Sequence, residues 1–143
     1  MKRDIRFIEY SRGSDKGDFK FDWNSSTTDV RGREKLIQDI VKRILTAKGS
    51  NVFDPEYGEN FYNLFGSFDP SKEQDVKESF PVLLKTMEDD IISEQSLNDT
   101  LTSSEKLLSL KLGEVKMDET SGSWVIKIQI KTEDLVNSFF TID

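Results

Sequence analysis

The feature that most constrains this fold lies late in the chain, where apolar and polar side chains begin to alternate. Apolar and polar side chains alternate over residues 106–117 and again over 123–132. The alternating apolar positions of the second run are Trp124, Ile126, Ile128 and Ile130. A period of two is typical of strands with one buried face. Turn-forming residues at 118–122 separate the runs, so the pattern predicts an antiparallel hairpin, with a bulge at Gly113.

An upstream segment predicts a helix that could cover the buried face. Apolar residues between Arg31 and Lys48 recur at helical spacing and make one stripe. The members of the stripe are Leu36, Ile37, Ile40, Val41, Ile44 and Leu45. Asp29 is the expected N-cap, Glu34 is suited to the first turns, and Gly49 is the expected C-cap. The sequence therefore predicts one helix over 31–48.

A second helical region is interrupted by a proline. Residues 61–65 predict a short helix, and a longer apolar stripe runs to about Glu94. Its expected members are Val82, Leu83, Met87, Ile91 and Ile92. Pro81 either kinks one long helix or starts a second one in its first turn. The polar residues 95–104 predict a linker to the hairpin.

Both ends of the chain carry apolar residues, which we expect to be buried against another surface. Residues 4–10 predict a short strand, and 11–28 a polar loop with an extended piece at Phe19, Phe21 and Trp23. The tail at 134–143 must dock on its own domain or meet a partner. Because helices precede the hairpin, we expect a small single α+β domain. Its parts are an extended arm (1–28), a helical part (29–94) and a β part (106–143).

Composition excludes most hydrolase chemistries but leaves mechanisms and metal sites that use carboxylates alone. The chain contains no cysteine and no histidine, which removes disulfides, thiol catalysis, histidine-based triads and zinc sites built on those ligands. The acidic run at 88–90 lacks the glycine and the spacing of a calcium loop, so it predicts a solvated helix face. No cofactor or metal is expected. No apolar run is long enough for a membrane span or a secretion signal, which favours a cytoplasmic site of synthesis.

Charge is unevenly distributed along the chain. Residues 1–48 hold 12 basic and 8 acidic residues (+4), and the remaining 95 residues carry −11, for a net charge of −7. This asymmetry either reflects ordinary solvated faces or orients the protein in an assembly through complementary patches. The basic half is too weakly basic to predict nucleic-acid binding.

The stretch from Val30 to Gly58 resembles the baseplate wedge, or sheath-initiator, family of contractile tails. This family includes the lysozyme-like baseplate proteins of contractile phages and comparable components of type VI secretion systems and related injection particles. The matching positions are Gly32, Leu36, Gln38, Leu45, Thr46, Pro55, Tyr57 and Gly58. The order of elements is also similar along nearly the whole chain. One departure is that the family's Glu-Pro-Arg triplet has no counterpart, since no arginine follows Arg43.

Most of these motif positions predict roles in the fold. Gly32 would allow close packing, and Gln38 is either a solvated helix position or an amide bonded to a neighbouring backbone. Tyr57 and Gly58 would fix the turn, with Tyr57 packed under the helix. The motif therefore indicates a fold more firmly than a binding surface.

The resemblance implies a non-enzymatic virion protein of the tail baseplate, assembled in the host cytoplasm. Such a protein docks on the wedge and templates the first sheath ring by strand addition, in multiple copies around a symmetric ring. Its partners would be sheath subunits and other wedge proteins, with no nucleic acid and no membrane. The helix 31–48 and the segment 82–94 would face the wedge. The hairpin would be the template, completed by strand 4–10 and tail 134–143. The expected partner-binding residues are Trp124, Ile126, Ile128, Ile130, Phe139 and Phe140.

Two other functions compete with this interpretation. The same fold could serve a cytoplasmic adaptor or regulator that binds one soluble protein. A glycosidase that uses two carboxylates is the enzymatic alternative, with Asp54, Glu56 and Glu34 as candidates. Because Asp54 and Glu56 flank a turn proline, where acids are usually solvated, we expect no catalytic residues.

Overall fold

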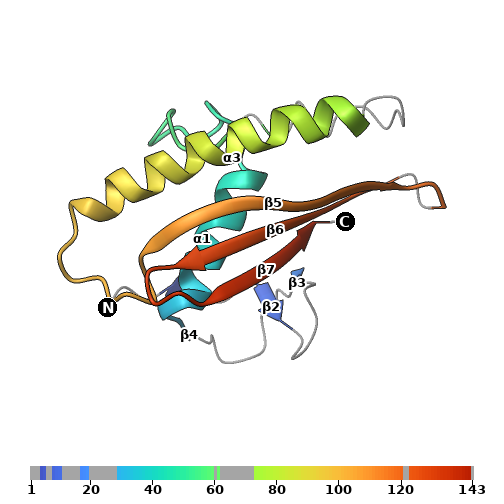
Figure 1. Cartoon of the computed structure of the whole chain (residues 1–143). Coiled ribbons are helices and arrows are strands. Elements are labelled where there is room, and N and C mark those ends of the chain that lie inside the picture. The colour runs from blue at the N-terminus through green and yellow to red at the C-terminus, as the bar shows by residue number, and fades with distance from the viewer. Residues whose placement is uncertain are drawn as a thin grey trace, which may run out of the picture.

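A computed structural model describes residues 4–5, 8–10, 17–19, 29–59, 61, 73–120 and 123–142. Its main body is an antiparallel three-stranded sheet covered by two helices (Figure 1). The helices are α1 (Gly32–Leu45) and α3 (Glu73–Ser96), and the strands of the sheet are β5 (Leu107–Asp118), β6 (Ser123–Thr132) and β7 (Asn137–Ile142). The prediction of a small α+β domain is therefore confirmed.

The predicted hairpin is present with nearly the predicted bounds. Strands β5 and β6 pair from Leu107 with Thr132 to Asp118 with Ser123. The register shifts between Leu112 and Glu114, which confirms the bulge expected at Gly113. A second shift next to Leu107 was not predicted.

The tail docks on its own domain as the third strand of the sheet. In the turn before β7, the N–H of Leu135 donates to the carbonyl of Thr132 at 2.9 Å. The N–H of Thr132 in turn donates to the carbonyl of Val136 at 3.2 Å. Antiparallel partners exchange hydrogen bonds on alternate residues only, so the pair Thr132–Val136 determines which residues of β7 bond to β6. The even-numbered residues of β7 then bond to β6, and the N–H and C=O groups of Phe139 and Thr141 point away from it.

The prediction that strand 4–10 completes this sheet is wrong. Instead, β1 (Asp4–Ile5) pairs with β4 (Asp29–Val30), and β2 (Ile8–Tyr10) pairs with β3 (Gly17–Phe19). Strand β3 lies close to β7 but is not hydrogen-bonded to it. The predictions at Phe21 and Trp23, and most of the short helix expected over 61–65, fall outside the described residues.

Helix α1 is shorter than predicted, and neither expected cap is correct. Asp29 lies in β4, and Arg31 occupies the N-cap position with extended backbone and no side-chain hydrogen bond to the helix. At the other end the cap is Thr46, whose N–H donates to the carbonyl of Arg43 at 3.3 Å. Five members of the predicted stripe are buried, but Leu45 is exposed because the helix ends there.

Helix α3 is continuous through Pro81, which settles the choice between one helix and two. Its buried stripe differs in phase from the predicted one. The buried apolar residues are Val76, Phe80, Leu84, Met87 and Ile91. Val82 and Ile92, which were expected in the stripe, lie on the exposed side.

The core lies between these helices and one face of the sheet. Figure 1 shows α1 crossing behind the sheet and α3 running along β5. The even-numbered residues of β6 point into the core, and the ring of Phe61 packs on that of Phe80 with centroids 4.7 Å apart. Polar residues occupy the opposite face, where the Lys127 ammonium lies 4.6 Å from the ring centroid of Phe139. One face of the sheet is therefore used for folding, as its alternation predicts.

Candidate functional site

Helix α3 hydrogen-bonds the outer edge of β5. The N–H of Leu110 donates to Oε2 of Glu88 at 2.7 Å, and the N–H of Leu107 donates to Oε1 of Gln95 at 2.7 Å. The Gln95 amide also donates to the carbonyl of Glu105 at 2.9 Å. These groups would otherwise be available to an added strand. This edge of the sheet is therefore capped at two amides.

The prediction of a solvated face over 88–90 holds for Asp89 and Asp90, which are exposed, but is wrong for Glu88. Glu88 is 7% exposed, and its other oxygen accepts a hydrogen bond from Lys85 Nζ at 2.6 Å. Hydrogen bonds to Glu88 and Asp89 raise the pKa of Lys85. Glu88 lies four residues after Leu84 and three before Ile91, both buried. That spacing placed it on the core side, and was the signal that could have identified it.

We expect replacement of Glu88 with alanine to lower the free energy of unfolding by about 2 kcal/mol, because the buried Leu110 amide loses its acceptor. Glu88→Gln keeps an acceptor for this amide and should lose less than half as much. Asp89→Ala, on the exposed side of the same turn, should stay within about 0.5 kcal/mol. Urea unfolding followed by circular dichroism measures all three. Equal losses at Glu88 and Asp89 would contradict the capping role.

The opposite edge of the sheet belongs to β7. No described strand is hydrogen-bonded to the outer side of β7, which leaves the backbone groups of Phe139 and Thr141 without a strand partner there. Figure 1 shows β7 on the side of the sheet away from α3. Within the described part of the chain, the sheet thus has one capped edge and one unpaired edge.

Most side chains expected to bind a partner lie in the core. Those that are buried are Trp124, Ile126, Ile128, Ile130 and Phe140. They hold the sheet to α1 and α3, so what these strands can offer a partner is backbone. Phe139, the sixth residue, lies on the other face under Lys127 and is partly exposed.

A dense set of hydrogen bonds fixes the turn that follows α1. The N–H of Gly49 donates to the carbonyl of Pro55 at 2.9 Å, and the N–H of Glu59 donates to the carbonyl of Thr46 at 3.0 Å. Oδ1 of Asn51 accepts the N–H of Phe53 at 3.0 Å. Burial and the nearby Asp90 charge raise the pKa of the Glu59 carboxyl. These bonds make residues 47–59 an ordered projection, which we call the 47–59 turn.

The residues that match the motif over Val30–Gly58 differ in what they do in the fold. Gly58 fixes the turn as predicted, because a Cβ there would lie 2.4 Å from the carbonyl oxygen of Thr46. Tyr57 packs beneath the Arg43 guanidinium, whose carbon lies 5.3 Å from the ring centroid. A Cβ on Gly32 would meet only Ser104 Oγ at 3.9 Å, so close packing does not explain that glycine. Gln38 is buried, which excludes the solvated alternative.

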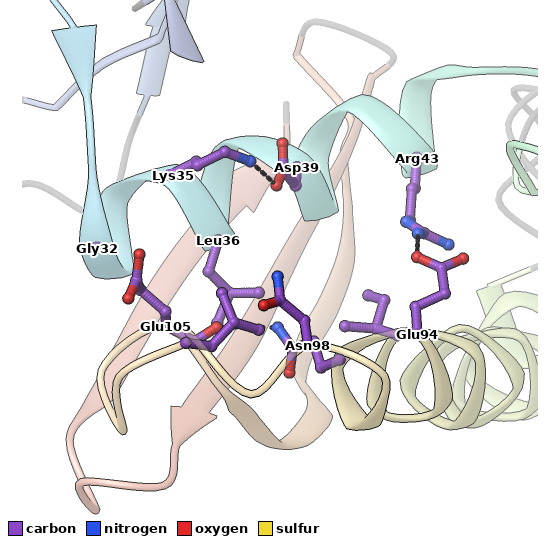
Figure 2. A pocket seen from close by; sticks show the side chains of 11 residues that line it. Gly32, Lys35, Leu36, Asp39, Arg43, Glu94, Asn98 and Glu105 are labelled. Atoms are coloured by element: carbon purple, nitrogen blue, oxygen red, sulfur yellow. Dashed lines mark hydrogen bonds and ion pairs between the residues drawn. The ribbon is translucent and has the colours of Figure 1, made fainter. Parts of the chain in front are cut away.

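A cavity of about 170 Å³ lies between α1, the end of α3 and the segment after it (Figure 2). Two ion pairs line it, Lys35 with Asp39 and Arg43 with Glu94. The buried Glu105 carboxylate accepts the N–H of Thr102 at 2.9 Å and its hydroxyl at 2.7 Å, and these donors lower the pKa of Glu105. Because four of the five charged side chains that line the cavity form ion pairs and the fifth, Glu105, is hydrogen-bonded to Thr102, the cavity has no strongly charged wall to attract a ligand.

Of the acids considered for glycoside hydrolysis, Asp54 and Glu56 lie on the 47–59 turn and Glu34 lies in the first turn of α1, and none of them lines this cavity. Oδ1 of Asp54 accepts the N–H of Glu56 at 3.2 Å, and Glu56 pairs with Lys48 at 3.1 Å, which raises the pKa of Lys48. In the described residues no three carboxylates gather into a group that could hold a metal ion. No helix in the same residues is long and apolar enough to cross a membrane.

Comparison with known proteins adds no assignment. No protein-family model matches this chain, and no curated protein matches it in sequence.

Proposed function

We propose that this protein is a structural component of a contractile-tail baseplate or related injection machine. It docks on the wedge and offers a sheet edge on which the first ring of sheath subunits adds strands. The observation that carries the proposal is the asymmetry of the sheet: α3 caps two amides of β5, whereas no strand among the described residues pairs with the outer side of β7. An unpaired edge is the surface that strand addition requires. The motif at Val30–Gly58 supplies the resemblance to sheath initiators.

Charge and side-chain placement also support a backbone template. The inward side chains of β6 are already used by the core, so an added strand would find its register mainly through main-chain hydrogen bonds. The outward side chains of β7 include Phe139, which lies under Lys127 of β6, and Asn137, which accepts a hydrogen bond from Gln129 at 3.0 Å; these β7 side chains can contact side chains of the added strand. A strand added beside β7 would thus meet a mixed basic, amide and aromatic face.

The test is sheath nucleation with one backbone group removed. Thr141→Pro deletes an N–H that points away from β6, so the β6–β7 pairing should survive while strand addition should not. Thr141→Ala is the matched control. We expect wild type and Thr141→Ala to nucleate rings when mixed with the cognate sheath subunit, as seen by electron microscopy. Thr141→Pro should nucleate few or none, with an unchanged far-ultraviolet spectrum.

Two results would overturn parts of this proposal. Full nucleation by Thr141→Pro would show that β7 is not the template. No nucleation by wild type, with the wedge components present, would reject the initiator role and favour an adaptor that binds one soluble partner.

A further inference from the structure

The tip of the 47–59 turn presents two apolar side chains to solvent. Phe53 is 99% exposed and its neighbour Val52 is 88% exposed. An isolated exposed apolar residue is ordinary on protein surfaces, but adjacent exposed apolar side chains form a contiguous patch that a partner can cover. The hydrophobic effect opposes this arrangement unless something covers the pair.

The turn cannot bury these side chains by relaxing locally. Asn51 Oδ1 accepts the N–H of Phe53, and the backbone bonds from Gly49 to Pro55 and from Glu59 to Thr46 close the turn on both sides. Beneath it, Tyr57 is held by Arg43, which also pairs with Glu94 of α3. The tip is therefore presented in a fixed position, which lowers the entropy lost on binding.

The turn lies at the far end of α1 from the β7 edge. Arg33, in the first turn of α1, pairs with Asp134 in the turn that leads into β7, whereas Arg43 in the last turn contacts Tyr57. Ten residues of helix separate these arginines by about 15 Å along its axis. Figure 1 agrees, since the segment after α1 lies beside α3 and away from β7. One molecule can thus bind two partners at once.

The charges next to the tip indicate the kind of surface that receives it. Asp54 and Glu56 are exposed beside Phe53; Glu56 pairs with Lys48, whereas Asp54 has no ion pair among the described residues. A negatively charged membrane would repel these acids, and a wholly apolar surface would leave them desolvated. They are compatible with a protein pocket that is apolar at its centre and basic at its rim.

From these observations we infer that Val52 and Phe53 are the anchor with which this protein enters a basic-rimmed apolar pocket on a wedge protein. The inference rests on the proposed function and adds the surface and the chemistry of the wedge contact. The wedge binds at the 47–59 turn while the sheath binds at β7, which places the two partners at opposite ends of α1.

The test measures binding to the purified wedge complex of the same particle, prepared without this chain. Phe53→Ser should weaken binding about tenfold or more, the size expected for a central aromatic anchor, without changing the melting temperature. Asp54→Asn keeps the acceptor for the Glu56 amide but removes the charge. It should reduce the salt dependence of binding. Leu97→Ser is the matched control, because Leu97 is 89% exposed on a different turn, and it should bind as wild type does.

Sheath nucleation, measured on the same proteins, separates the two proposals. Phe53→Ser that nucleates sheath normally and fails to bind the wedge supports the inference. Wild-type wedge affinity in Phe53→Ser, or equal losses in Phe53→Ser and Leu97→Ser, would overturn it while leaving the template at β7 intact. Wild type that nucleates sheath but does not bind the wedge would also overturn it. Wild type that does neither would overturn both proposals.

Discussion

Replacing Gly58 with alanine should destabilise the protein by about 3 kcal/mol, because two penalties act at the same position. The residue has φ of +99°, which side chains other than glycine rarely adopt. The added methyl group would also lie 2.4 Å from the carbonyl oxygen of Thr46, and a backbone oxygen cannot move aside cheaply. That carbonyl accepts the N–H of Glu59, so the closing bond of the turn would be strained as well.

A second glycine in the same turn separates these two penalties. Gly49 also has a positive φ, of +87°, but nothing lies within 4 Å of where its Cβ would be. Gly49→Ala should therefore lose only about 1 kcal/mol, the conformational part alone. Thermal and urea unfolding of the two variants give the comparison. Equal losses of stability in the two variants would show that the contact with Thr46 relaxes and that the positive φ is the only reason for a glycine at position 58.

Replacing Pro81 with alanine should stabilise the protein by about 2 kcal/mol. Proline inside a helix is roughly 3 kcal/mol less favourable than alanine. Pro81 has no N–H to donate to the carbonyl of Lys77, and its ring crowds that carbonyl. Proline also restricts the unfolded chain, which favours folding, so its removal offsets up to about 1 kcal/mol of that gain. Pro81 is exposed, so little packing is lost when its ring is removed.

The control for this substitution is Val82→Ala, which changes helix propensity at the next exposed position by only about 0.5 kcal/mol. Both variants should shift the urea midpoint upward with an unchanged slope, and Pro81→Ala should shift it several times further. A loss of stability in Pro81→Ala would show that the proline sets a bend that Phe80 and Leu84 need for their packing.

The sequence was most informative where one physical rule determined the structure. Strict alternation predicted β5 and β6 with their bulge, because a side-chain period of two allows one buried face only. Five apolar positions of α1 were predicted for the same reason at helical spacing. The position of the tail was harder to predict, since its apolar residues required a surface to contact but the sequence pattern did not identify that surface. The structure places the tail on β6.

The missed features depend on contacts between distant parts of the chain. Glu88 is buried because β5, 22 residues later, needs an acceptor for the Leu110 amide. Asp29 is drawn into β4 by pairing with β1, which overrides its preference for a helix cap. The exposed tip at Phe53 follows from hydrogen bonds that close the turn around Asn51 and Pro55. Helical spacing could have placed Glu88 on the core side, but neither composition nor periodicity identifies its partner or the other two pairings.

The bonds from α3 to Leu107 and Leu110 also determine how copies of this chain can associate with one another. A sheet that can be extended on both sides is able to propagate into a fibre. Two molecules that met through β7 would use the free backbone groups of that edge, and growth on the other side of the sheet would have to displace α3 from Leu107 and Leu110. Helix α3 thus opposes growth of the sheet beyond a pair, while leaving the fold able to receive a strand from another protein.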